Sequence, residues 1–284
     1  MVELFFATLL LTGPTSVQDT TFQVREGDQL VLRDFSGTVE VEGWDRSELW
    51  AEVDDFDALP FRLSRAGDRV TLDLADRRSR REAEELRIQL PRWMALEISG
   101  RELDVDVKGL ENRVTVRTLE GDITLEELMG EVDASTVEGS IEARDLRGSA
   151  RLKTGDDDIT VLDTRGRLEI ETVSGDVDLL RSSTESVDVR TTDGDVSFDG
   201  RLLPSGVYAF HSHSGDLTLN LEPPVDADVT VLVYKGELES DFPMRAQGYR
   251  SGQDLRFSIG EGGAKVLLDA FDGEVRLRRA RGSR

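Results

Sequence analysis

The segment Thr118-Leu-Glu-Gly-Asp-Ile-Thr124 recurs along the chain, first as Thr136-Val-Glu-Gly-Ser-Ile-Glu142, and then as Thr154-Gly-Asp-Asp-Asp-Ile-Thr160 and Thr172-Val-Ser-Gly-Asp-Val-Asp178. Three further copies follow, which are Thr191-Thr-Asp-Gly-Asp-Val-Ser197, Ser212-His-Ser-Gly-Asp-Leu-Thr218 and Val233-Tyr-Lys-Gly-Glu-Leu-Glu239. The glycine position falls at 121, 139, 157 (Asp), 175, 194, 215 and 236, so the successive steps are 18, 18, 18, 19, 21 and 21. A period of this length is typical of repeat proteins, in which each unit buries its apolar side by stacking on its neighbours.

Each repeat contains two short β-strands. A second motif begins nine residues after the glycine of the first, as in Gly130-Glu-Val-Asp-Ala134. Apolar and polar side chains alternate with a period of two, so that Ile123 and Leu125 share one face and Thr124 lies on the other. No stretch after residue 100 has the spacing of an amphipathic helix.

These patterns predict an all-β fold, a single-domain β-solenoid of the parallel β-helix or β-roll type. Its two-strand rungs follow the glycine steps of 18 to 21, and β caps cover its ends. Antiparallel meanders of the same period are the alternative, because periodicity shows which residues face inward but not which strands pair. The glycine position is predicted to be a turn with positive φ, and Asp157 fits there because Asp also adopts positive φ at low cost.

Residues 1–17 are predicted to be a signal peptide. The eight residues 4–11 form an apolar run that is too short to span a hydrocarbon core of about 30 Å. Such a run suits a cleaved secretory signal, although Glu3 stands where Lys or Arg is expected, and a buried first strand is the alternative. No other segment is apolar enough to cross a membrane. We therefore expect an exported protein, periplasmic or at the cell surface.

The rest of the chain is predicted to be one continuous domain, residues 18–284, because no linker interrupts it. Residues 18–100 form an N-terminal β cap, in which the charged run 76–85 is a solvated loop. Residues 101–240 form the solenoid. Residues 241–284 form a C-terminal β cap with a last rung at Phe271-Asp-Gly-Glu-Val-Arg-Leu277 and a basic tail. End units differ from the others because an open end must be covered.

The charge balance argues against nucleic acid as a partner. The chain has 58 acidic and 35 basic residues and a net charge of −23, whereas binding to nucleic acid depends on Lys and Arg. The terminal arginines, at positions 276, 278, 279, 281 and 284, are expected to be a solvated tail. There is no cysteine, so disulfides, thiolate metal sites and cysteine nucleophiles are excluded.

Three sets of motifs resemble those of the bacterial putative-adhesin family of unknown function, a group of exported or membrane-linked β proteins. They are Gly37-Thr-Val-Glu-Val-Glu-Gly-Trp-Asp45, the serial Ser-Gly-Asp-Val and Asp-Gly-Asp-Val turns, and the closing Gly260-Glu-Gly-Gly-Ala264 and Asp272-Gly-Glu-Val-Arg-Leu277. The resemblance covers residues 30–278. It implies the β fold and an adhesin-like role, and because the motifs are turns, it implies no catalytic residues.

An aspartate follows the glycine position in most repeats. Stacking should align Asp122, Asp158, Asp176, Asp195 and Asp216. These five are candidate calcium ligands, and a calcium-dependent surface module is one alternative for the function. However, Ser140 interrupts the row, the Gly-Gly-x-Gly element of calcium-binding β-rolls is missing, and calcium needs six to eight converging oxygens. We therefore expect turn-forming aspartates, with no cofactor.

Two further groups have a structural and a functional interpretation. The hydroxyl residues three positions before each glycine are expected to hydrogen-bond along the rod axis, or else to form a sugar-binding face; they are Thr118, Thr136, Thr154, Thr172, Thr191 and Ser212. His211 and His213 lie on the same side of one strand, and Asp216 is a third ligand for a zinc ion in the alternative view. We expect ordinary surface imidazoles.

The predicted function is a noncatalytic, exported cell-envelope module that acts as an adhesin-like binding or scaffold protein. Its partner is an envelope polysaccharide or a protein, and a binding face would consist of outward residues such as Thr124, Glu142, Thr160 and Asp178. A carbohydrate-active parallel β-helix enzyme is the alternative. It is disfavoured because every acidic row is a repeat feature, whereas a catalytic acid stands apart in a cleft.

Overall fold

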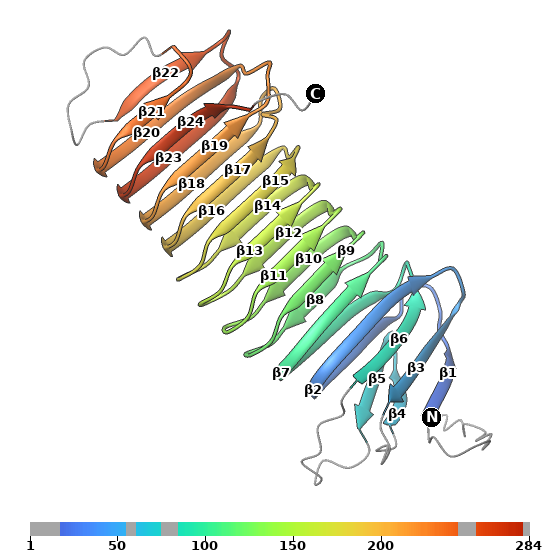
Figure 1. Cartoon of the computed structure of the whole chain (residues 1–284). Helices are drawn as coiled ribbons and strands as arrows, with labels where there is room; N and C mark the ends of the chain where they lie inside the picture. Colours follow the sequence, from blue (N-terminus) through green and yellow to red (C-terminus); the bar gives the residue numbers. More distant parts are fainter. Residues whose placement is uncertain (1–17, 55–60, 75–84, 244–253, 281–284) are drawn as a thin grey trace.

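The computed structural model describes residues 18–54, 61–74, 85–243 and 254–280 and contains 24 strands and no helix in these residues. The strands stack into a straight rod (Figure 1). Pairing within the repeats is parallel and in register, which confirms the β-solenoid and excludes the antiparallel meander. The predicted signal peptide and nearly all of the predicted charged loop lie outside the described residues.

Two columns of strands form the rod. The first column contains β8 (Val114–Arg117), β10 (Met129–Ser135), β12 (Arg147–Lys153), β14 (Arg165–Glu171), β16 (Ser186–Asp193) and β18 (Val207–Ser214). The second contains β9 (Ile123–Glu126), β11 (Ile141–Arg144), β13 (Ile159–Leu162), β15 (Val177–Ser182), β17 (Val196–Gly200) and β19 (Leu217–Leu221). In both columns every second side chain is buried, so the core lies between the columns. Equivalent residues stack on one another, for example Ile123, Ile141, Ile159 and Val177.

The N-terminal end of the rod contains two long rungs and an antiparallel edge. The strands here are β1 (Gln18–Gln23), β2 (Gln29–Trp44), β3 (Glu48–Asp54), β4 (Phe61–Ala66), β5 (Arg69–Leu74), β6 (Glu85–Pro91) and β7 (Ala95–Lys108). β2 and β7 each span both columns, and they pair in parallel. β5 and β6 form a further rung on the outer side of β2, although they follow it in sequence. β3 and β4 pair antiparallel to this outer rung, and they cover its edge.

At the C-terminal end the order of the rungs departs from the order of the sequence. The strands are β20 (Ala227–Lys235), β21 (Leu238–Ser240), β22 (Leu255–Ile259), β23 (Ala264–Asp272) and β24 (Val275–Arg279). The rung of β23 and β24 pairs with β18 and β19 on one side and with β20 and β21 on the other (Figure 1, dark red). The sequence predicted it as the last rung, which is wrong. The rung formed by residues 227–240 is farther out, with β22 antiparallel at its edge.

The glycines between the columns are selected by the close approach of neighbouring rungs. A Cβ atom on Gly139 would lie 2.1 Å from the carbonyl oxygen of Gly121, and one on Gly175 would lie 2.2 Å from that of Asp157. Gly139 also has a φ of +144°. Asp157 is not among the positive-φ residues, so that part of the turn prediction is wrong. The non-glycine residues with positive φ in the solenoid lie at or next to the other turn of the rung; they are Glu127, Asp145, Asp163, Arg181 and Ser205.

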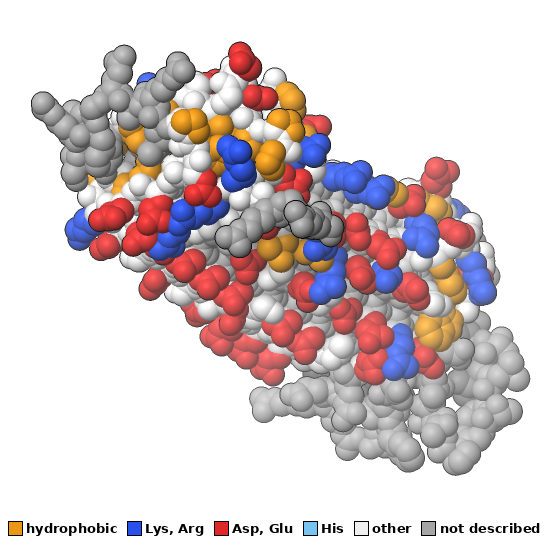
Figure 2. All heavy atoms as spheres, turned by 45° about the horizontal axis from the view of Figure 1, so that its top comes forward, with side chains coloured by type: hydrophobic (Ala, Val, Ile, Leu, Met, Phe, Trp, Pro, Cys, Tyr) orange, Lys and Arg blue, Asp and Glu red, His pale blue; other side chains and the backbone are white. Residues whose placement is uncertain are grey.

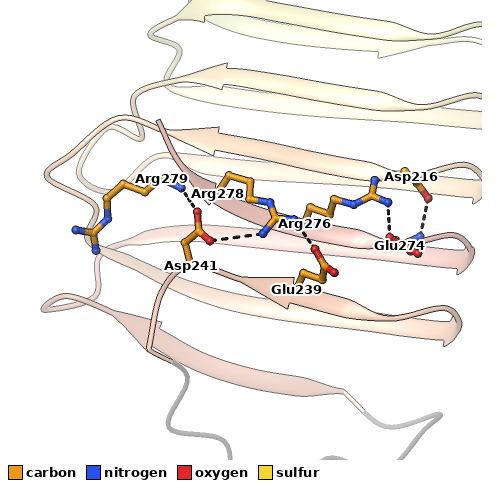
Figure 3. Close-up of polar contacts among 7 residues, drawn as sticks. All are labelled: Asp216, Glu239, Asp241, Glu274, Arg276, Arg278 and Arg279. Carbon is orange, nitrogen blue, oxygen red and sulfur yellow. Dashed lines mark hydrogen bonds and ion pairs between the residues drawn. The ribbon is translucent and has the colours of Figure 1, made fainter. Parts of the chain in front are cut away.

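Ion pairs join the inserted rung to both of its neighbours (Figure 3). One guanidinium nitrogen of Arg276 lies 2.6 Å from the Asp216 carboxylate, and Arg276 also pairs with Glu274. Arg278 reaches Glu239 and Asp241 on the outer side. Arg276, Arg278 and Arg279 therefore belong to β24, and their assignment to a solvated tail is wrong, while residues 281–284 lie outside the described residues. A basic strand between two acidic rungs reduces repulsion in a chain of net charge −23.

Asp216→Asn is expected to lower the free energy of unfolding at pH 7 by about 1 kcal/mol, because hydrogen bonds to a charged group are lost. Burial raises the pKa of Asp216, but hydrogen bonds from the Glu274 amide and from Arg276 outweigh it and hold the pKa below the ordinary 3.8. The unfolded chain therefore takes up this proton first as the pH falls, and the contribution of Asp216 disappears below pH 3.8.

Urea denaturation at a series of pH values measures this effect. The difference between wild type and Asp216→Asn should be present at pH 5 to 7 and should shrink at pH values below about 3.8. Asp45→Asn is the control, since the side chain of Asp45 is 91% exposed although it contacts Arg92. A difference of equal size at all pH values would contradict the assignment to the Asp216 carboxylate.

Candidate functional site

An open groove of about 860 Å³ lies on the outward face of the first column. It crosses the rungs from β12 to β18 and continues onto the inserted β23 and the outer β20. Parts of two rows of side chains line it, the first at the C-terminal ends of the strands and the second two residues earlier in each strand. Each row contains one residue from each rung.

The first of these, the edge row, consists of the residue that directly follows each buried hydroxyl position of the repeat. In spatial order its members are Leu119, Val137, Gly155, Val173, Thr192, His213, Phe271 and Tyr234. The groove is lined by the part of this row from Val173 to Tyr234, and Leu119 lies outside it. The five large apolar members are 39% to 55% exposed. The rings of His213 and Phe271 are stacked with centroids 4.7 Å apart and planes 6° apart, and Tyr234 lies 5.5 Å beyond Phe271. Aromatic side chains exposed in this way are enriched where proteins bind ligands.

The second row lies two positions earlier in the repeat and is charged. Its members are Lys153, Glu171, Arg190, His211 and Asp269, one on each successive rung. Lys153 pairs with Glu171, and the Nδ1 atom of His211 lies 3.5 Å from the Asp269 carboxylate. The groove therefore combines an apolar edge with side chains that donate and accept hydrogen bonds.

The five candidate calcium ligands accept hydrogen bonds from backbone amides. One carboxylate oxygen of Asp122 accepts hydrogen bonds from the amide and hydroxyl of Ser140, at 2.8 and 2.9 Å. Asp158, Asp176, Asp195 and Asp216 each accept the amide of the equivalent residue on the next rung, at 2.7 to 2.8 Å. These bonds tie neighbouring rungs together at the turn. In the part of the chain that the structure describes, no three acidic or imidazole groups are arranged as a metal site.

The threonine row is internal. Its members are 3% to 7% exposed, so they form no sugar-binding face. Thr136 and Thr154 donate to the carbonyl oxygens of Gly121 and Gly139 on the preceding rung, as expected for bonding along the axis. At the level of the groove, the hydroxyls of Thr172 and Thr191 have no hydrogen-bond partner in the structure.

The histidines face outward as predicted, but the third ligand assigned to them does not lie with them. His211 faces Asp269 and His213 stacks on Phe271, while Asp216 is paired with Arg276. Both neighbours of the histidines belong to the inserted rung. The contacts of His211 with Asp269 and of His213 with Phe271 therefore follow from the spatial order of the rungs.

The predicted binding face is aligned on the outside of the second column. Thr124, Glu142, Thr160 and Asp178 lie in register on successive strands. Thr124 also lines a smaller groove of about 290 Å³, near Trp50 and Arg87. Acidic side chains extend along the rod (Figure 2, red).

The pKa of Asp178 is raised above its ordinary value of 3.8. Burial is the main cause, and the nearby Asp176 and Asp158 carboxylates add to it. Asp178 lies outside both grooves. A catalytic acid requires a tuned pKa and a position next to a bound substrate, and Asp178 lacks the second of these.

The fold and the groove define a parallel β-solenoid with one extended outward face. Residues 78–278 match the family described as Toastrack DUF4097, and the chain belongs to that family. This confirms the resemblance seen in the sequence. No curated protein matches the chain, and no helix in the described residues is long and apolar enough to cross a membrane.

Several solved bacterial structures match the chain at low sequence identity. A putative lipid binding protein from Parabacteroides distasonis ATCC 8503 is 11% identical over 92% of this chain and 97% of its own, with a TM-score of 0.47. A putative adhesin from the same organism is 11% identical over 93% and 98%, with a TM-score of 0.44. A putative adhesin from Bacteroides fragilis NCTC 9343 is 13% identical over 93% and 98%, with a TM-score of 0.41.

The groove was not predicted from the sequence, although part of its signal is present there. An exposed apolar residue after the buried threonine occurs in Leu119, Val137 and Val173, and this breaks the alternation of inward apolar and outward polar residues. The repeat motif places Phe271 and Tyr234 at the same position as these residues, but their order along the row could not be read from the sequence, because their rungs are not stacked in sequence order.

Proposed function

We propose that the protein is an exported, noncatalytic module of the bacterial cell envelope that binds an envelope component through the outward face of its solenoid. The observation that carries the proposal is the open groove, in which the apolar edge row lies beside the row of charged side chains. A rigid stack of in-register rungs keeps such a surface extended, because every backbone strand is fixed by its neighbours.

The electrostatics favour binding over catalysis. In the groove, carboxylates such as Glu171 and Asp269 face a cation or an imidazole at short range. The raised pKa of Asp178 occurs on another face. A hydrolase would need a carboxyl pair at a cleft, with one group protonated and one ionised.

The test is to incubate labelled protein with envelopes isolated from the producing bacterium and to measure both retention and the release of reducing sugar. We expect saturable binding with no release of sugar above the level of heat-denatured protein. Release of reducing ends would support the β-helix enzyme. A lack of retention would contradict an envelope-binding role.

A further inference from the structure

The stack of rings in the edge row ends at His213, and the rungs beyond it leave an open space. On one side His213 is stacked on Phe271. On its other side the next rung carries Thr192, a short and exposed side chain, and the rung after that carries Val173. Since neighbouring strands lie about 4.8 Å apart, one flat ring over Thr192 would contact both His213 and Val173.

We propose that the groove binds a polysaccharide chain and that one pyranose ring lies over Thr192, between the imidazole of His213 and the side chain of Val173. This inference rests on the proposed function and adds the site and the ligand class. A pyranose has apolar C–H groups on its faces and hydroxyls around its rim. The two faces of the sugar fit against the imidazole ring of His213 and the side chain of Val173. The sugar would thereby extend the row of stacked rings formed by His213, Phe271 and Tyr234.

The side chains beside this space suit the rim of a sugar. Glu171 and Arg190 lie on the two strands next to it, and Lys153 lies one rung farther along the groove. Together they supply acceptors and donors for hydroxyl groups. Both faces of this ring are covered along the rod axis, so its glycosidic bonds leave from the rim and the neighbouring sugars extend across the strands, where the groove is open.

The charge of the groove distinguishes a sugar from other ligands. Lys153 and Arg190 balance the formal charges of Glu171 and Asp269, in a chain of net charge −23. A nucleic acid would need an excess of cations. An acyl chain or an apolar peptide segment would cover charged groups without pairing them, which costs free energy. A chain of hydroxyl-bearing rings avoids both penalties.

The experiment compares the full chain with two variants of equal bulk. Thr192→Trp fills the space over Thr192, whereas Leu119→Trp adds the same ring to the edge row outside the groove, where Leu119 is 46% exposed. Three probes are used: whole envelopes, the envelope polysaccharide freed of protein and lipid, and vesicles of the extracted envelope lipid. Thermal unfolding of each variant checks that it is folded.

The expected result is that wild type and Leu119→Trp bind the polysaccharide equally, and Thr192→Trp binds at least about tenfold more weakly. Equal binding by Thr192→Trp would overturn the groove as the site. Binding to whole envelopes or lipid vesicles without binding to the polysaccharide would overturn the ligand class. In both cases the envelope-binding function would stand, and only a failure to bind whole envelopes would remove it as well.

Discussion

Gly139→Ala should destabilise the solenoid by about 3 to 5 kcal/mol, as the sum of a backbone and a packing cost. The φ of +144° is rarely adopted by residues with a side chain, which contributes about 1 to 2 kcal/mol. The added Cβ would also lie 2.1 Å from the carbonyl oxygen of Gly121, so the two rungs must separate at a point where they are hydrogen-bonded. Such a separation disturbs the rungs on both sides.

Gly67→Ala separates these two costs. Gly67 has a φ of +69°, and nothing lies within 4 Å of the position that a Cβ would take. Gly67→Ala should therefore lower the free energy of unfolding only by the backbone contribution, about 1 to 2 kcal/mol. Urea denaturation gives both values from the midpoint at unchanged slope. If Gly139→Ala costs no more than Gly67→Ala, close approach of the rungs is not the reason for glycine.

Phe198→Ala should cost about 3 to 5 kcal/mol, the range for removing a fully buried ring. Phe198 is 0% exposed, and its ring lies 6.0 Å from that of Tyr208 and 5.6 Å from that of Phe210. Phe198 lies on β17, and Tyr208 and Phe210 lie on β18. The three rings pack together in the core at the rungs where the step between successive glycine positions increases from 18 to 21. Removing the central ring leaves a cavity that the rigid strands cannot close.

Leu119→Ala is the matched control, because Leu119 also has a large apolar side chain but is 46% exposed. It should change the free energy of unfolding by less than about 0.5 kcal/mol. Thermal unfolding followed by circular dichroism, together with urea denaturation, measures both variants. A cost below about 1.5 kcal/mol for Phe198→Ala would mean that the core collapses around the vacated space.

Much of the fold followed from one repeated motif. The alternation around Ile123 and Ile141 identified the inward faces, and the constant period placed equivalent residues on top of each other. The aspartate and threonine rows were identified from the same period. Their roles required the structure, because only coordinates show that the Asp122 carboxylate accepts a neighbouring amide and that Thr136 points inward.

The candidate site depends on contacts between distant segments. Periodicity specifies neighbours only where each rung follows the previous one in the chain. The rungs of β2 and of β23–β24 instead lie between rungs from other parts of the sequence. No local pattern encodes such an insertion, since parallel pairing of one strand with another leaves the strand's own alternation unchanged.

The sequence by itself determined the all-β class, the two-strand rung, the inward faces and the acidic charge. The tertiary structure alone decided the order of the last rungs, and with it the stack of His213, Phe271 and Tyr234, which occur in the sequence as 213, 234 and 271. The physical reason is that the order of parallel rungs depends on contacts between segments far apart in the chain, and these contacts include the ion pairs of the β24 arginines with carboxylates on both neighbours. Placed between two acidic rungs, this strand forms ion pairs on both sides, whereas at the end of the rod it would form them on one side only.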